Sequence, residues 1–512
     1  MARSRQRTIG NNKRLATQQS VNAAIKSICD IMRRSNCAGA LQYVPELTWM
    51  LFLRILDERE SCEAEAAEAV GAEYSPSLEA PYRWRDWAAP DGNKRRELEG
   101  GSLGAFFGFV NSDLIPHLKR LRERPNATSR QKIISEIFSG VERTRIDTER
   151  NLLDVLDKVN EISDEHVDKT HIFTLSQVYE GLLLSMGEKG NDGGQFFTPR
   201  EIIRVMVRAI DPRIGQTVYD PGCGTGGFLA QAYEHMTGKD NIKITSPDQL
   251  ETLKTRTFYG REKDNAIYPI ALANLVLHGI DEPHIWHGNT LTGGEIYGGL
   301  FEGAPALYDV ILMNPPFGGK EGKEAQTRFT YKTGATQTLF LQHVIDHLEP
   351  QSGRCGIVLD EGVLFRTNET AFVQTKRKLL DECDLWCIVS LPSGVFTAAG
   401  AGVKTNLLFF TKGKPTEKVW YYDLSDIKVG KKTPLTAAHF EDFFRLLPSQ
   451  ADSPRSWTVT RQEIEAKNYD LKAVNPNRKL TEDTRTPEEL LNFIEAKGRE
   501  VSEALAALRR TR

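Results

Sequence analysis

Apolar positions in the first third of the chain recur with helical spacing. This spacing is found over residues 21–60, 103–121, 152–159 and 172–186, and it is interrupted around Pro81, Trp84, Trp87 and Pro90. Apolar residues three and four positions apart share one face of a helix, and that face must pack against another element. The pattern therefore predicts a mostly α-helical N-terminal domain over residues 20–186.

Between residues 187 and 430, short apolar runs of strand length alternate with helical segments. The predicted strands are 217–219, 257–260, 285–286, 308–313, 355–359, 385–391, 406–410 and 419–422. The predicted helices are 201–210, the segment ending near 236, 266–278, 338–348 and 370–380, and a polar insertion covers 238–255. Alternating strands and helices predict an α/β fold with a parallel, doubly wound sheet.

The last part of the chain is polar. The strand pattern ends near residue 430, and residues 487–508 carry one apolar helix face. We predict a C-terminal helical region over 431–512 whose last helix packs either on its own domain or on a partner.

Composition narrows the class of protein. The net charge of −3 excludes a polycation, so contact with nucleic acid requires local patches or a partner. Seven cysteines without paired CxxC spacing favour a reducing cytoplasm over a zinc site or a disulfide framework. Residues 1–19 form a basic tail without the apolar stretch of a signal peptide, and no apolar run is long enough to span a membrane. The tail serves either solubility or contact with phosphate.

Chemistry-bearing residues follow three of the predicted strands. Asp220 and a turn with glycines at 222, 224, 226 and 227 follow the first, without the GxGxxG spacing of a pyrophosphate binder. Glu262 follows the second and suits ribose hydroxyl groups. Asn314-Pro315-Pro316-Phe317 follows the fourth. Ligands bind at the carboxyl ends of the strands in such sheets, so an adenosine-bearing cofactor and a planar substrate could share this edge.

Methyl transfer to an exocyclic amine explains these residue types. The Asn314 side-chain oxygen and the Pro315 carbonyl can accept both N–H groups of the amine, which frees its lone pair, and Phe317 can stack on the base. A base inside a duplex must be flipped out to reach such a site.

The motifs taken together resemble the modification (M) subunit of type I restriction-modification systems, a DNA adenine-N6 methyltransferase that uses S-adenosyl-L-methionine and has a Rossmann-like sheet. The resemblance rests on Leu51–Leu56, Gly194–Arg200, Asp220–Phe228, Asn314–Phe317, Leu391–Phe396 and Asn468–Leu471, in this order. It implies a methyltransferase domain over 187–430 and host DNA protection as the biological role.

The resemblance assigns the site residues one by one. The catalytic residues would be Asn314, Pro315, Pro316 and Phe317. The cofactor-binding residues would be Gln195, Phe196, Phe197, Thr198, Pro199, Arg200, Asp220, Gly222, Gly224, Thr225, Gly226, Gly227, Glu262 and Asn289. Asn289 stands where the family often has aspartate. No metal site is expected, because His343 and His347 share a helix face without a third ligand.

The implied partners are double-stranded DNA, a separate specificity (S) subunit, a second copy of the chain in an M2S1 complex, and restriction (R) subunits in the nuclease form. Other interpretations remain open at this point. The same fold and motif serve protein-glutamine and RNA methyltransferases, and a non-catalytic DNA-binding scaffold is the alternative from another class. The basic loop over 318–335 is either a surface loop or a lid that contacts DNA phosphate.

Overall fold

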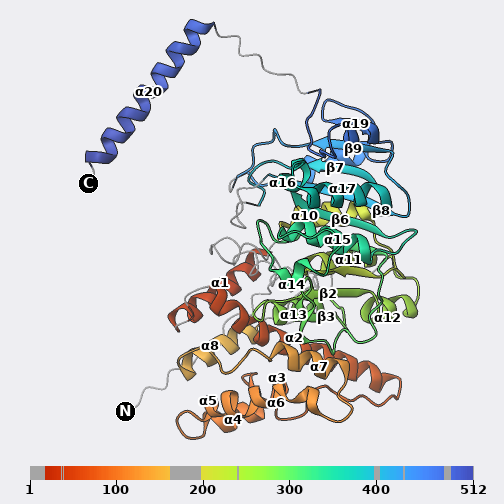
Figure 1. Cartoon of the computed structure of the whole chain (residues 1–512). Helices are drawn as coiled ribbons and strands as arrows, with labels where there is room; N and C mark the ends of the chain where they lie inside the picture. The colour runs from red at the N-terminus through yellow and green to blue at the C-terminus, as the bar shows by residue number, and fades with distance from the viewer. Residues whose placement is uncertain are drawn as a thin grey trace.

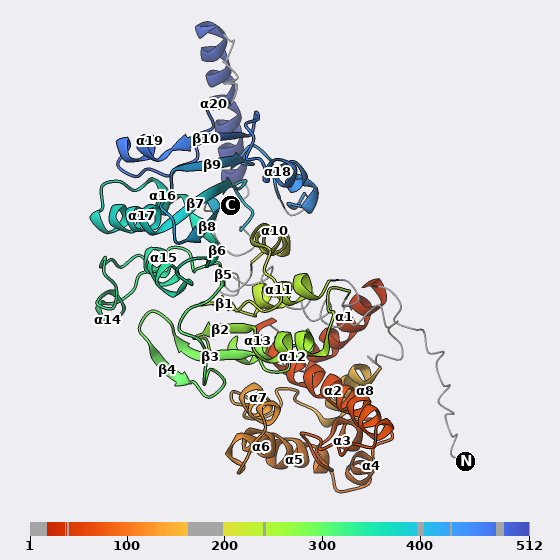
Figure 2. The ribbon, with the colours of Figure 1, turned by 90° about the vertical axis from the view of Figure 1, so that its right-hand side faces the viewer.

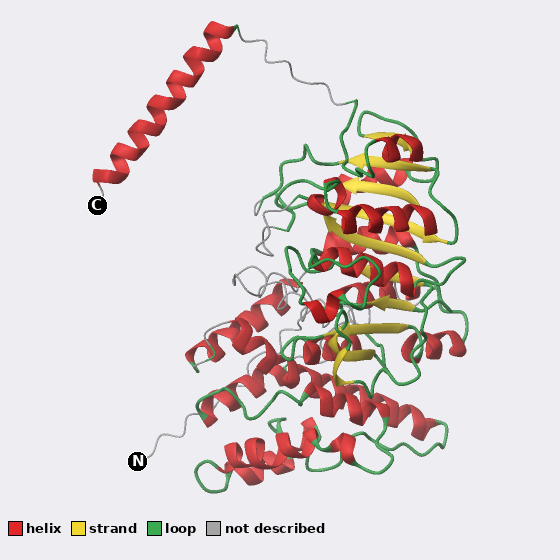
Figure 3. Ribbon diagram, viewed as in Figure 1, coloured by secondary structure: helices red, strands yellow, loops and turns green. Residues whose placement is uncertain are grey.

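The computed structural model describes residues 18–35, 37, 40–161, 198–238, 242–396, 404–430, 433–477 and 486–510. The basic tail, the predicted helix over 172–186, the polar linker and Gln195–Phe197 therefore lie outside the described residues, apart from positions 18 and 19 in the first helix. The figures show a helical N-terminal layer, a large mixed sheet with helices on both faces, and a separate C-terminal helix (Figures 1 and 3).

The N-terminal part is helical, as the spacing predicts. Its elements are α1 (Gln18–Arg34), α2 (Ala40–Ala69), α3 (Trp84–Trp87), α4 (Asn93–Glu99), α5 (Ala105–Phe109), the π-helical η1 (Val110–Leu114), α6 (Ile115–Lys119), η2 (Leu121–Glu123), α7 (Ser129–Ile137) and α8 (Glu149–Asn160). The tryptophan-rich segment that interrupts the helical spacing belongs to the core. Trp84 and Trp87 are buried and pack against each other with ring centroids 5.7 Å apart. Buried aromatic side chains thus fill the core in the segment that lacks helical spacing.

The ten-stranded sheet has the order β10-β9-β7-β8-β6-β5-β1-β2-β3-β4. The strands are β1 (Val218–Asp220), β2 (Phe258–Glu262), β3 (His284–Asn289), β4 (Gly294–Tyr297), β5 (Val310–Met313), β6 (Arg354–Asp360), β7 (Cys383–Ser390), β8 (Thr405–Lys412), β9 (Lys418–Asp423) and β10 (Ser456–Thr460). Strands β3, β2, β1, β5 and β6 are parallel neighbours, which confirms the doubly wound core.

The expectation of a parallel sheet is wrong at β8 and at the two edge strands, whereas β7 and β9 are also parallel neighbours. Strand β8 is antiparallel to both β6 and β7, and β4 and β10 add antiparallel edges. The sheet therefore continues past residue 430 to Thr460, beyond the predicted last strand. Both edge strands expose side chains, so their sequences lack the continuous apolar run that reveals a central strand.

Helices cover both faces of the sheet (Figure 2). They are α10 (Arg200–Ile210), α11 (Gly227–Thr237), α12 (Pro247–Thr255), α13 (Tyr268–Leu277), α14 (Lys323–Gln326), α15 (Thr336–His347), α16 (Glu361–Phe365), α17 (Thr370–Glu382), η7 (Ala437–Phe440), α18 (Glu441–Leu446) and α19 (Arg461–Ala466). Helix α12 lies inside the polar insertion that the sequence pattern left without structure. Helices α10, α11 and α13 lie on one face, and α15 and α17 on the other.

The helical layer packs on α13 through α2 and α7. Asp281, just after α13, accepts a hydrogen bond from Arg59 of α2 at 3.1 Å and one from Lys254 of α12 at 3.1 Å. Arg59 also donates to the carbonyl of Val276 at 2.9 Å. One hydrophobic core runs without interruption from the N-terminal helices into the sheet layer.

Helix α20 (Pro487–Arg510) stands away from the rest of the molecule in Figure 1. Leu491, Phe493, Ile494 and Val501 on it are between 46% and 62% exposed. Within the described ranges, no helix is long and apolar enough to cross a membrane.

Candidate active site

A cavity of about 480 Å³ opens at the carboxyl ends of the parallel strands. Its lining comes from the turn after β1, from the ends of β2, β3 and β5, and from the starts of α10 and α15. This volume lies in the usual range for a small-molecule site, and the place is where ligands bind in open α/β sheets.

The glycine turn forms one wall. Gly226 has φ +80°, a conformation that a side chain would strain, and it precedes the first residue of α11. Asn274 of α13 donates a hydrogen bond from Nδ2 to the carbonyl of Thr225 at 2.8 Å. Helix α13 therefore holds the turn through a residue that lines the cavity beside Thr225.

Two buried carboxyl groups flank this turn. Asp220 accepts the backbone N–H of Gly222 at 3.1 Å, and Glu262 accepts that of Gly224 at 2.9 Å. Burial raises the pKa of Asp220 to about 8, and the nearby Glu262 adds to the rise. Burial also raises the pKa of Glu262 to about 7, even though three backbone N–H groups favour its charged form. A cationic ligand in the cavity would stabilise both carboxylates.

The end of β3 supplies the neighbouring wall. Asn289 accepts the backbone N–H groups of Leu291 and Thr292 through Oδ1, at 3.0 and 3.2 Å. Thr290 donates from Oγ1 to the carbonyl of Pro221 at 2.6 Å and so ties this loop to the glycine turn. Oδ1 of Asn289 thus holds its own turn, and its Nδ2 group can donate to a ligand at a position where an aspartate would accept.

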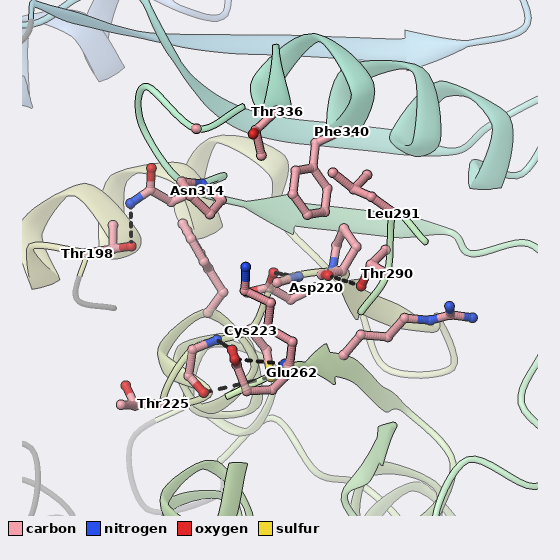
Figure 4. A pocket seen from close by; sticks show the side chains of 18 of the residues that line it. Thr198, Asp220, Cys223, Thr225, Glu262, Thr290, Leu291, Asn314, Thr336 and Phe340 are labelled. Carbon is pink, nitrogen blue, oxygen red and sulfur yellow. Dashed lines mark hydrogen bonds between the residues drawn. The ribbon is translucent and has the colours of Figure 1, made fainter. Parts of the chain in front are cut away.

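Asn314 directly follows β5 on the opposite side of the site (Figure 4). Its Nδ2 donates a hydrogen bond to Oγ1 of Thr198 at 3.0 Å. Its Oδ1 is buried and has no hydrogen-bond partner in the part of the chain that the structure describes. A buried acceptor without a partner is costly in a folded protein, and it marks a place where a donor can bind.

The other members of the motif are fixed by later elements. The carbonyl of Pro315 accepts a hydrogen bond from Nε2 of Gln337, at the long distance of 3.5 Å. Oε1 of Gln337 accepts the backbone N–H of Asp360 at 3.0 Å. The ring of Phe317 lies against that of Phe396, with centroids 5.3 Å apart. The motif thus joins β5 to α15 and to the segment after β7.

The loop over 318–335 has regular structure. It includes α14, and a β-bridge joins Lys320 to Ala335 where the loop begins and ends. Gln342 pairs with the backbone of Tyr331 through both of its amide atoms at 2.9 Å. Arg328 donates to the carbonyl of Thr292, and this bond links the loop to the segment that follows β3. The alternatives of surface loop and DNA-contacting lid both stay predictions.

The structure brings most of the predicted site residues to this cavity. Those that line it are Thr198, Arg200, Asp220, Gly222, Gly224, Thr225, Gly227, Glu262, Asn289, Asn314, Pro316 and Phe317. Pro199, Gly226 and Pro315 adjoin the cavity without lining it, and Gln195, Phe196 and Phe197 lie outside the described residues. Thr198 does not cap α10: the capping position belongs to Pro199, without a side-chain cap, and Arg200 begins the helix.

Further lining residues escaped the sequence pattern. The ring of Phe340 points from α15 into the cavity, with Leu291 beside it in Figure 4. An apolar residue on a helix gives no sign in the sequence that it faces a site instead of the core. Asn274 is different, since a polar residue within an otherwise apolar helix is a signal that could have been read.

The histidine pair that drew attention in the sequence belongs to the core. His343 and His347 stack with ring centroids 3.9 Å apart, and Nε2 of His343 lies 3.2 Å from the hydroxyl of Tyr219. Burial lowers the pKa of both histidines. Among the described residues no group of three metal-ligating side chains is found.

Comparisons with known proteins agree with this architecture. A family model described as N-6 DNA Methylase matches residues 170–485, and one described as the HsdM N-terminal domain matches residues 21–159. The chain is 35% identical over 505 residues to the type I restriction enzyme EcoEI methylase subunit of Escherichia coli, covering 96% of this chain and 97% of that protein.

Two solved structures are similar over nearly their whole length. A modification subunit assigned to a type I restriction enzyme of Vibrio vulnificus YJ016 is 32% identical with a TM-score of 0.76, covering 90% of this chain and 98% of that one. A chain from a study of complex assembly and conformational transition in the type I R-M system is 36% identical with a TM-score of 0.75, covering 96% and 98%. The chain therefore belongs to the N-6 DNA methylase family, as an adenine-specific DNA methyltransferase and a methylase subunit of the type I restriction-modification kind.

Proposed function

We propose that the cavity at the ends of β1, β2, β3 and β5 is where a methyl group passes from S-adenosyl-L-methionine to the N6 amino group of an adenine flipped out of DNA. The observation that carries this proposal is the buried Oδ1 of Asn314, which has no partner among the described residues although its Nδ2 is bonded. Such an acceptor binds a hydrogen-bond donor, and the N6 amino group of adenine supplies one.

The charged groups of the cavity fit the proposed cofactor. When bound, S-adenosyl-L-methionine supplies an electrophilic methyl group on a sulfonium. Asp220 and Glu262 are buried carboxyl groups with raised pKa values, and the positive charges of this cofactor would compensate for their burial. Glu262 is suited to accept from ribose hydroxyl groups. Arg200, which lines the cavity at the start of α10, is suited to the carboxylate of the methionine part.

The chain's own residues would prepare the amine for attack. Oδ1 of Asn314 and the carbonyl of Pro315 accept its two N–H groups, which draws the nitrogen out of the plane of the base and localises its lone pair. Phe317 lines the same cavity and offers its ring to the flipped base. Both acceptors belong to adjacent residues of one rigid strand end, so they are held in place before the base arrives.

The test replaces Asn314 by alanine in the full chain, assembled with its specificity subunit. Methyl transfer from labelled S-adenosyl-L-methionine to DNA should fall at least about a thousandfold, because the principal acceptor is lost. Cofactor affinity, measured by calorimetry, should change less than about threefold. Asn93→Ala, at an exposed position of α4, is the matched control and should transfer like the parent. Retained transfer in Asn314→Ala would refute the proposal.

We also propose the partners and the division of labour within the complex. A specificity subunit would select the DNA sequence, and two copies of this chain would join one such subunit, with restriction subunits added in the nuclease. The domains would be the tail 1–19, the helical domain 20–186, the methyltransferase domain 187–430 and the partner-binding region 431–512, whose strand β10 is added to the sheet of the methyltransferase domain. The exposed apolar side chains of α20 support a partner surface in the last region.

A further inference from the structure

We propose that Thr198 is a positioning residue for methyl transfer, which supplies the acceptor that the Asn314 amide needs in its base-binding orientation. This inference rests on the proposed function and deepens it. Its basis is one hydrogen bond, from Nδ2 of Asn314 to Oγ1 of Thr198 at 3.0 Å, together with the buried and unpartnered Oδ1 on the other side of the same amide.

The side-chain amide of asparagine has an oxygen end and a nitrogen end with opposite hydrogen-bonding roles. Oδ1 accepts hydrogen bonds and Nδ2 donates two, and a rotation of the amide group by 180° exchanges their positions. The target amino group only donates in this site, so the amide must face it with Oδ1 and must turn Nδ2 away. In that orientation the partly buried Nδ2 requires an acceptor, since a donor without a partner costs free energy.

Thr198 is placed to meet this requirement from another element. It lies two residues before the start of α10, whereas Asn314 directly follows β5, so the pair spans 116 positions in the chain. The hydroxyl is the part of Thr198 that matters for this role, because Oγ1 is the atom within hydrogen-bonding distance. Its methyl group could be kept or lost without changing the bond.

A second consequence links the amide to the cofactor side of the cavity. Thr198 precedes Pro199, whose carbonyl accepts from the N–H groups of Ile202 and Ile203 in the first turn of α10. The acceptor for Asn314 is therefore fixed to a helix whose first residue, Arg200, lines the same cavity. Helix α10 thus contributes to the orientation of the reacting amine as well as to the cofactor wall.

The test compares Thr198→Val, which keeps the shape and loses the hydroxyl, with Thr198→Ser, which keeps the hydroxyl and loses the methyl. The full chain is used with its specificity subunit, and the methylated adenine is located beforehand by sequencing the modified DNA. Thr198→Val should lower kcat for methyl transfer about tenfold, as expected for one lost hydrogen bond. Thr198→Ser should restore kcat to within about threefold of the parent. Thr458→Val is the matched control, because Thr458 is an exposed residue of edge strand β10 and the substitution should leave kcat unchanged.

A second readout separates positioning from a general loss of structure. Duplexes that carry 2-aminopurine at the target position report base flipping by fluorescence, and this base lacks the 6-amino group that Asn314 would accept. Thr198→Val should leave that signal within about twofold of the parent, while kcat for transfer to adenine, measured at saturating S-adenosyl-L-methionine, falls. Thr198→Ala serves as a second variant and should behave like Thr198→Val.

The possible results fall into three groups. Unchanged transfer in Thr198→Val, an equal loss in Thr198→Ser, or a parallel loss of base flipping would each overturn the positioning role. Failure of both Thr198→Val and Thr198→Ala to fold would also overturn it in favour of a structural role. A parent complex that methylates no adenine would refute the proposed function itself, which is a separate outcome.

Discussion

The ring of Phe317 meets the ring of Phe396 at an angle of 66°, with centroids 5.3 Å apart. Phe317 follows the strand end that carries Asn314, and Phe396 belongs to the segment that follows β7. An edge-to-face pair of this kind fixes ring orientation. The residue proposed to stack on the base is therefore braced by a segment about 80 residues further along the chain.

Replacing Phe317 by alanine should weaken the capture of the flipped base. Stacking of a base on an aromatic ring contributes about 1–3 kcal/mol, so KM for DNA should rise about tenfold or more. Phe317→Tyr keeps a ring and should stay within about threefold of the parent. Steady-state kinetics with varied DNA concentration provide the measurement, and an unchanged KM in Phe317→Ala would exclude stacking on this ring.

Cofactor affinity should depend on pH in a defined direction. Glu262 has its pKa raised to about 7 and Asp220 to about 8 in the ligand-free protein, and a cationic cofactor favours the charged forms. Binding below these values must release protons, so affinity should increase as pH rises from about 6 to about 8, by at most tenfold per pH unit for each proton released.

Calorimetry in two buffers of different ionisation enthalpy would count the released protons. Glu262→Gln should bind the cofactor more weakly and release fewer protons, since it lacks one titrating group and places an amide nitrogen among three backbone N–H donors. Affinity that falls as pH rises would contradict the proposed charge pairing.

The stability of the ligand-free protein should follow the opposite trend. A carboxyl group whose pKa is higher in the folded than in the unfolded chain stabilises the fold most at low pH. For Glu262, this contribution is complete below its unfolded value of about 4.3 and is lost as pH rises through about 7. Chemical unfolding of the parent and of Glu262→Gln at several pH values should show a difference that shrinks on acidification.

Asp281→Ala should loosen the contact between the helical layer and the sheet layer. Asp281 is 22% exposed and loses its bonds to Arg59 and Lys254 in this variant. Arg130 forms a third, longer ion pair with Asp281. Removing the shared partner of three cations at a partly buried site should lower the free energy of unfolding by about 1–3 kcal/mol. Thermal unfolding at low and high salt would measure it, with exposed Asp91→Ala as the control. Equal stability of the two variants would show that the apolar contact suffices.

Removing α20 should separate assembly from catalysis. A chain that ends after residue 485 lacks Leu491 and Ile494, which are each 62% exposed and contribute little to the rest of the fold. The truncated chain should keep its unfolding temperature and its cofactor affinity. Its affinity for the specificity subunit should fall at least about tenfold, so the two should no longer co-elute. Paired Leu491→Glu and Ile494→Glu substitutions test the same face without truncation, and normal co-elution of both forms would place the partner surface elsewhere.

Local patterns determined much of this protein. Apolar spacing gave the N-terminal helices and the parallel strands, because one-sided burial imposes a period on the sequence. Residue chemistry at the strand ends pointed to Asp220, Glu262 and Asn314, since the topology of a doubly wound sheet brings such ends to one edge. Their order also carried the family resemblance.

Only the tertiary structure decided the antiparallel additions to the sheet and the partners of each site residue. Strand β10 is half exposed, so its sequence lacks the apolar run that marks a central strand. The bond between Thr198 and Asn314 joins positions 116 apart, and no local periodicity reports a contact between two polar side chains. Such contacts depend on how α10, β5 and α15 pack around one cavity, and packing is a property of the whole chain.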